Sequence, residues 1–72
     1  MNLSCLLPGE AGFITGIEPC SMKERLLELG FLGRVQCVAE AAMGGPSAYL
    51  IRGAVIALRK EDAIHIRVDF YE

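Results

Sequence analysis

Residues 21–33 read Ser-Met-Lys-Glu-Arg-Leu-Leu-Glu-Leu-Gly-Phe-Leu-Gly, and this stretch predicts one short helix inside an otherwise strand-like chain. Ser21 and Glu24 have the spacing of a capping box, which predicts that the helix begins near Ser21. At about 100° per residue, Met22, Leu26 and Leu29 fall on one stripe. This stripe is expected to pack on a core.

Glycine marks the end of this helix. Gly30 follows the last periodic apolar position, where a residue without a Cβ permits the left-handed conformation of a helix C-terminus. Phe31 comes next, at the position where a Schellman motif makes an apolar contact with the last turn. Gly33 is then predicted to turn the chain into the next strand.

Composition places the chain among small globular domains. It has 72 residues, 53% of them apolar, and a net charge of -2. One domain over residues 1–72 is expected, and the negative balance argues against a sequence-independent grip on nucleic acid, which needs clustered Lys and Arg. No apolar run approaches the ~20 residues of a membrane-spanning helix. Three widely spaced cysteines fit reduced thiols, so a cytoplasmic location is predicted without membrane insertion.

The segments before and after this helix read as strands. Ala11–Ile17 is one, and its glycines indicate a bulge that lets Ile14 and Ile17 both serve the core, with Phe13 also assigned inward. Residues 34–40 alternate between polar and apolar, which predicts a buried Cys37. Upstream of both, residues 3–7 form a short apolar stretch.

The C-terminal half predicts a hairpin and a last strand. Arg52-Gly53 is the expected hairpin turn, which would pair Leu50 with Val55. The inward side chains are expected to be Tyr49, Ile51, Ile56 and Leu58. Residues 60–63 are read as a polar turn, and Ile64, Ile66, Val68 and Phe70 as the inward face of the last strand. The prediction is a mainly β fold: a small SH3-like barrel of about five strands with one short α-helix.

Motifs spread along nearly the whole chain carry a family resemblance. They are Leu6-x-Pro8-Gly9, Ile14-x-x-Ile17, Arg25-Leu26-x-x-Leu29-Gly30-x-x-Gly33, Pro46 and Gly53-x-x-Ile56-Ala57-Leu58-Arg59, with Ala63 and Ile66 following. In order and spacing they resemble the FeoA family. The chain departs from the family pattern at Gly44-Gly45-Pro46, where an acidic residue is common before the proline, which weakens any idea of a metal ligand in that loop.

The resemblance implies a non-enzymatic cytosolic accessory of bacterial ferrous iron uptake. Its expected partner is the cytosolic part of the membrane transporter FeoB, which carries a GTP-binding domain, and its expected role is to modulate the activity or assembly of FeoB. The same domain resembles the C-terminal module of some metal-dependent repressors. Because this chain lacks the DNA-binding and metal-sensing parts of such repressors, the stand-alone accessory is favoured over a regulatory SH3-like module.

Six residues are predicted to bind a partner. Leu50 and Val55 would form an apolar outer face of the hairpin, flanked by Arg52 and Arg59. On the helix, Leu27 lies on the polar side with Lys23 close to it, where packing on the core does not explain it. Isolated surface aliphatics and a tolerant helix surface are the alternative explanations.

No catalytic, cofactor or metal-binding residue is predicted. His65 has no nucleophile to serve, Cys20 has no assignable base, and no phosphate-binding glycine loop occurs. A carrier that binds Fe²⁺ or Zn²⁺ through Cys20 or His65 is the main alternative function. Capture of a proline-rich peptide is a weaker alternative, because few aromatic side chains are left to line a groove. Weak self-association and a monomer are equally compatible with the sequence.

Overall fold

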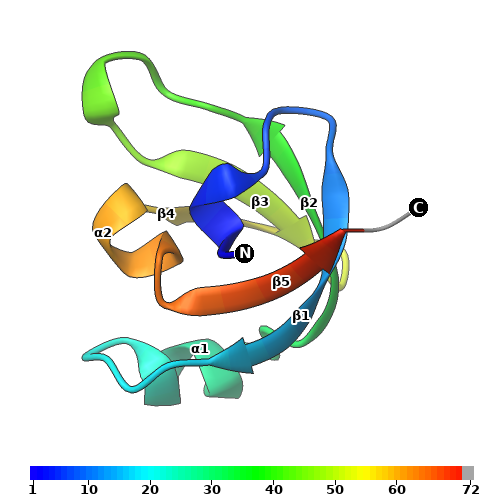
Figure 1. The fold of residues 1–72 in the computed structure, drawn as a ribbon, viewed down its shortest axis with the longest axis vertical. Helices are drawn as coiled ribbons and strands as arrows, with labels where there is room; N and C mark the ends of the chain where they lie inside the picture. The colour runs from blue at the N-terminus through cyan, green and yellow to red at the C-terminus, as the bar shows by residue number, and fades with distance from the viewer. Residues whose placement is uncertain (71–72) are drawn as a thin grey trace.

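The computed structural model describes residues 1–70, and the side chains of residues 42 and 70 lie outside the description. Five antiparallel strands form one curved sheet in the order β4-β3-β2-β1-β5 (Figure 1). The strands are β1 (Ala11–Ile17), β2 (Gly33–Ala39), β3 (Ser47–Ile51), β4 (Ala54–Leu58) and β5 (Ile66–Phe70). The mainly β prediction with five strands is therefore confirmed. No helix in the described part of the chain is long and apolar enough to cross a membrane.

Four short helical segments connect or flank the strands. Two are α-helices, α1 (Lys23–Glu28) and α2 (Lys60–Ala63), and two are 3-10 turns, η1 (Leu3–Cys5) and η2 (Ala42–Gly44). Residues 60–63 were predicted to be a polar turn, but they form a single helical turn whose Ala63 is fully buried. One turn is too short to show a helical period, which explains why the sequence does not reveal it.

The core lies inside the curve of the sheet. Leu3 and Leu6 of the N-terminal segment complete it, and Figure 1 shows η1 lying across the open side of the sheet beside β5. Cys37 is buried, as predicted. Thirteen buried side chains form this core: Leu3, Leu6, Ile14, Leu26, Phe31, Val35, Cys37, Tyr49, Ile51, Leu58, Ala63, Ile66 and Val68.

The start of α1 differs from the prediction. The N-cap is Met22, no side chain caps it, and the capping box of Ser21 and Glu24 is not formed. Instead, the backbone N–H of Lys23 donates to the carbonyl of Cys20 at 3.2 Å, so a turn of the backbone satisfies this donor. The helix thus begins two residues later than expected.

The end of α1 is the predicted Schellman motif. Gly30 has φ +76°, the N–H of Phe31 donates to the carbonyl of Leu26 at 2.9 Å, and the N–H of Gly30 donates to that of Leu27 at 3.0 Å. Phe31 and Leu26 are both fully buried. Leu29 was expected on the buried stripe, but it is the C-cap of α1 and is exposed.

The strands follow the predicted pattern with three corrections. β1 changes register against β5 between Ile14 and Gly16, which confirms the bulge. However, Phe13 is exposed, because it lies on the opposite face of β1 from Ile14. Ile64 is also exposed and precedes β5, and His65, expected in that strand, precedes it too.

Candidate protein-docking surfaces

The hairpin of β3 and β4 has the predicted register. Leu50 pairs with Val55 and Ala48 with Ala57, and the turn residues Arg52 and Gly53 both have positive φ, at 50° and 82°. Val55 is 63% exposed, whereas Leu50 is half-buried. The outer face of the hairpin is therefore apolar, and Val55 is its most accessible large side chain.

Arg52 connects this hairpin to α1. A Cβ atom added to Gly30 would lie 3.3 Å from Arg52 Cδ and 3.5 Å from Arg52 Nε. The arginine side chain therefore packs over the glycine that ends the helix. Nothing in the sequence predicts this contact, since it joins two segments that are far apart along the chain.

Three exposed leucines surround the same helix end. Leu27 is 43% exposed, Leu29 51% and Leu32 46%. The sequence analysis expected Leu27 to lie on the polar side of the helix, placed Leu29 in the core and did not consider Leu32. The position of Leu32 between Gly30 and Gly33, in a turn, was the available indication that its side chain would be exposed. We define the α1–hairpin surface as Leu27, Leu29, Leu32, Arg52 and Val55.

The six predicted partner-binding residues do not all meet in one place. Lys23 and Leu27 are four residues apart in α1 and share a face, and Arg52 lies at the end of that helix. Arg59 follows the far end of β4, roughly 20 Å along the strand from Arg52. Arg59 therefore belongs to a different part of the surface.

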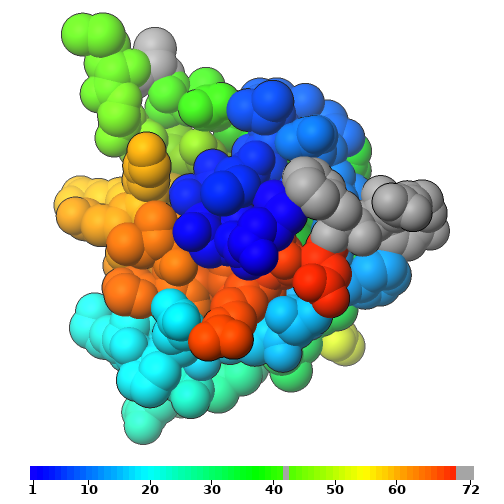
Figure 2. All heavy atoms as spheres, viewed as in Figure 1, coloured from blue at the N-terminus to red at the C-terminus, as the bar shows by residue number. Residues whose placement is uncertain are grey.

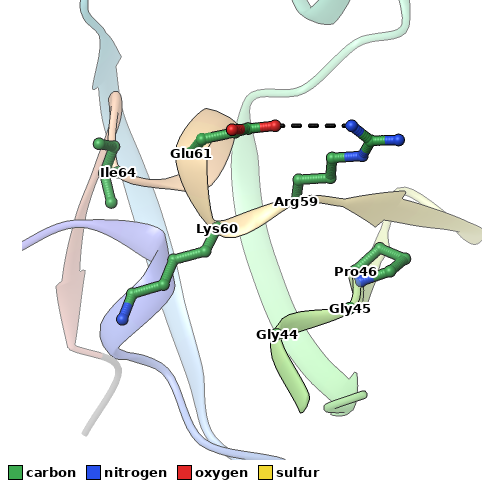
Figure 3. A pocket seen from close by; sticks show the side chains of 7 residues that line it. All are labelled: Gly44, Gly45, Pro46, Arg59, Lys60, Glu61 and Ile64. Atoms are coloured by element: carbon green, nitrogen blue, oxygen red, sulfur yellow. Dashed lines mark ion pairs between the residues drawn. The ribbon is translucent and has the colours of Figure 1, made fainter. Parts of the chain in front are cut away.

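Arg59 lines an open groove beside α2. The groove has a volume of about 680 Å³ and is lined by Gly44, Gly45, Pro46, Arg59, Lys60, Glu61 and Ile64. Figure 3 shows Pro46 on the loop side and Arg59 and Glu61 on the α2 side, with Lys60 pointing away from that pair. Arg59 Nη1 lies 3.6 Å from Glu61 Oε1, and both side chains are largely exposed. In Figure 2 the nearby segment around residues 43–45 projects from the body of the molecule.

A second polar cluster lies at the junction of β1 and β5. Glu18 Oε2 is 3.3 Å from Arg67 Nη2, and Glu18 Oε1 is 3.7 Å from His65 Nδ1. The backbone N–H of Glu18 also donates to the carbonyl of His65 at 2.7 Å. The Glu18 carboxylate thus lies between the side chains of Arg67 and His65. This local contact explains the position of His65 without a catalytic or metal-binding role.

Metal ligands do not gather anywhere in the described part of the chain. No group of three or more His, Cys, Asp or Glu residues there is arranged to hold a metal ion. Cys37 is buried in the core, and burial raises the pKa of its thiol, which disfavours the thiolate that a metal would need. Cys20, the cysteine of the carrier alternative, is half-buried just before α1.

These surfaces and this fold can be compared with known proteins. A family model described as the FeoA domain matches residues 1–69. The chain belongs to the FeoA domain family. Membership of this family is what supports the expectation that the chain is not an enzyme. The comparison with curated proteins found no match.

Solved structures agree with the FeoA assignment. The chain is similar to iron(II) transport protein A from Clostridium thermocellum, with 34% identity and a TM-score of 0.87 over 97% of this chain and 45% of that one. It therefore spans less than half the length of that protein. It is also similar to the FeoA protein of Chlorobium tepidum, with 24% identity and a TM-score of 0.91 over 100% of this chain and 71% of that one.

A third similar structure supplies the barrel description. FeoA from Stenotrophomonas maltophilia, complexed with zinc, is described as a prokaryotic SH3 domain protein. This FeoA domain shares 28% identity with it, at a TM-score of 0.85 over 96% of this chain and 89% of that one. The SH3-like fold predicted for this chain is thereby confirmed.

Proposed function

We propose that this FeoA domain is a cytoplasmic accessory of ferrous iron uptake that binds the cytosolic region of FeoB and modulates its activity or assembly. The observation that carries the proposal is the α1–hairpin surface. Three exposed leucines lie within six residues at one helix end, beside an arginine packed over Gly30, and exposed apolar side chains of this kind can serve as interface anchors. A role as a ferrous iron transport activating factor has also been suggested for the Stenotrophomonas protein.

The proposal includes a defined role for charge. Arg52 and Lys23 lie at opposite ends of α1, and the pair Leu50 and Val55 adjoins the turn that contains Arg52. Leucines at the centre would supply most of the binding free energy, whereas rim charges mainly steer the encounter. Binding should therefore weaken only modestly on replacing Lys23 and strongly on replacing Leu27.

Titration of the isotope-labelled chain with the soluble GTP-binding domain of FeoB tests this function. Backbone amide signals are followed with and without nucleotide. We expect localised shifts at residues 27–32 and 50–55, which are lost in Leu27→Lys. The matched control is Leu7→Lys, because Leu7 is an exposed leucine, 58% exposed against 43% for Leu27, that lies outside the α1–hairpin surface, so its replacement should leave binding unchanged. Absence of localised shifts at high concentration in both nucleotide states would refute the proposal for that domain.

A further inference from the structure

Strand β4 forms an open edge of the sheet. It is the last strand in the sheet order and pairs only with β3. In the described part of the chain, no backbone hydrogen bond joins Ala54–Leu58 to any segment outside that hairpin. The opposite edge is different: Asn2 bridges Arg67, and the N–H of Val68 donates to the carbonyl of Met1 at 3.0 Å. The N-terminus therefore covers part of β5, while β4 is uncovered.

The hairpin register shows which peptide groups are available on β4. The two-residue turn makes Ile51 and Ala54 the flanking pair, which exchanges both of its hydrogen bonds. Hydrogen-bonded and non-hydrogen-bonded pairs then alternate along an antiparallel ladder. The pairs Leu50–Val55 and Ala48–Ala57 are the non-hydrogen-bonded ones. The N–H and C=O groups of Val55 and Ala57 thus point away from β3.

This edge carries none of the usual protection against strand addition. Residues 54–58 read Ala-Val-Ile-Ala-Leu, without a charge or a proline, and their pairing with β3 shows no bulge. Natural sheets block exposed edges with such features. The edge is also roughly 13 Å long, enough for an extended segment to make several backbone hydrogen bonds.

Positive charges lie at both ends of the edge. Arg52 precedes β4 and makes no ion pair with the described residues, while Arg59 and Lys60 follow it. The exposed pair of Arg59 with Glu61 is weak, because solvent screens it, so Arg59 can exchange to another carboxylate. The groove beside α2 opens at this same end.

A second copy of this chain fits the edge poorly. Two β4 strands paired antiparallel about a two-fold axis at Ile56, the register that uses the outward groups of both Val55 and Ala57, would bring the Arg52 end of each copy to the end of the other that carries Arg59 and Lys60. Like charges brought close together in this way repel each other. A partner segment with carboxylates at its ends would instead meet Arg52 at one end and Arg59 with Lys60 at the other.

We propose that the free edge of β4 binds, by strand addition, an extended partner segment that is uncharged in its middle and acidic at both ends. The segment pairs with the outward peptide groups of Val55 and Ala57, and its terminal carboxylates contact Arg52 and Arg59. This deepens the proposed function by naming the binding mode and the chemistry of the bound segment.

The test uses the full isotope-labelled chain and a capped synthetic peptide, Glu-Glu-Thr-Val-Thr-Val-Thr-Glu-Glu. In the free protein we expect the amides of Val55 and Ala57 to exchange with solvent faster than that of Ile56. Saturation with the peptide should slow both amides by about tenfold or more. The same peptide with Lys in place of Glu should bind at least about tenfold more weakly. Amide exchange that stays fast under the Glu peptide overturns the proposal.

Two controls separate strand addition from charge attraction alone. Two further peptides are N-methylated on alternate residues, one on the odd-numbered and the other on the even-numbered positions. In one of them the methyl groups replace the N–H groups that face β4, and in the other those that face solvent. Only the first of these two peptide phases should lose binding. On the protein, Ala57→Pro removes an outward N–H without removing a bond to β3, and should abolish binding, whereas Ala57→Thr should keep it. Equal binding of both peptide phases overturns the proposal.

The remaining outcomes distinguish this inference from the proposed function. Concentration-dependent protection of Val55 and Ala57 without peptide would show that a second copy occupies the edge, and would overturn the acidic-segment assignment. Shifts on α1 with the FeoB domain, without protection of these amides, would overturn strand addition and leave the proposed function standing. Binding of the peptide at β4, without any change in the amide signals on adding the FeoB domain, would support strand addition at this edge and count against FeoB as the partner.

Discussion

The absence of a side chain at Gly12 allows strands β1 and β5 to approach closely. A Cβ added to Gly12 would lie 2.5 Å from the carbonyl oxygen of Asp69, which belongs to the backbone and cannot swing aside. Gly16, in the same strand, has open space around it. The sequence marks both glycines as departures from a regular strand, but only the structure shows that one of them is required by a neighbouring chain segment.

Replacing these two glycines should therefore have opposite consequences. We expect Gly12→Ala to lower the free energy of unfolding by about 1–3 kcal/mol, because the strands must separate to admit the methyl group. Gly16→Ala should be neutral or stabilising by up to ~1 kcal/mol, since it reduces the freedom of the unfolded chain. Urea denaturation of both variants checks this, and an equal loss in the two would contradict it.

Two buried titratable groups predict a loss of stability at alkaline pH. Burial raises the pKa of the Cys37 thiol above its ordinary 9.0 and that of the Tyr49 phenol above its ordinary 10.0. The unfolded chain then loses these protons at lower pH than the folded protein. These two groups therefore leave the free energy of unfolding unchanged below about pH 9. Above that pH they lower it, by up to ~1.4 kcal/mol per pH unit for each group.

Denaturation at a series of pH values measures this effect. Cys37→Val keeps a similar apolar volume without a thiol, so the fall in the free energy of unfolding should begin at higher pH in that variant. Tyr49→Phe should act in the same direction on the second group. An unchanged alkaline onset in both variants would show that other groups control it.

Among the elements, α1 shows what sequence patterns can and cannot reveal. Its C-terminal motif was predictable, because Gly30 and Phe31 are enough to specify a left-handed cap with an apolar contact. Its N-terminus was not, because the backbone carbonyl of Cys20 competes with the Ser21 side chain for the same role. The exposure of Leu29 was not apparent either, since the spacing of apolar residues does not show how far along a helix its contact with the core extends.

Substitutions at the two ends of α1 should reflect this difference. Gly30→Ala should cost about 1–2 kcal/mol, because its φ of +76° strains any residue with a Cβ and the methyl group would crowd Arg52 at 3.3 Å. Ser21→Ala should change the free energy of unfolding by less than ~0.5 kcal/mol, since this hydroxyl caps nothing. Thermal denaturation of the two variants tests this prediction. A larger loss of stability for Ser21→Ala would show that the Ser21 hydroxyl does cap the helix.

Across the whole molecule, local patterns set the strands and their register, while the docking surfaces depend on distant contacts. The pairing of Leu50 with Val55 follows from the two-residue turn alone. The packing of Arg52 on Gly30 and the groove that Arg59 lines arise only when separate segments meet. For this reason the sequence could suggest individual candidate residues for partner binding but not how they are grouped on the surface.

Closure of the core by the N-terminal segment gives the fourth prediction. Leu3 is fully buried while Leu7, in the same segment, is 58% exposed. Leu3→Ala should cost about 2–5 kcal/mol, a large share of the stability of so small a domain. Leu7→Ala should stay within ~0.5 kcal/mol. Comparable losses in the two variants, measured by urea denaturation, would mean that η1 does not seal the barrel.

The unequal edges of the sheet also limit how this chain can polymerise. A sheet with two bare edges can add copies without end and grow into a fibril. Here Met1 and Asn2 occupy part of one edge, so two copies joined through β4 would each present a blocked side to any third. Any self-association through this sheet, which like charges at the ends of β4 already disfavour, should therefore go no further than a pair, and concentrated solutions should stay free of fibrils for as long as the N-terminal residues remain in place.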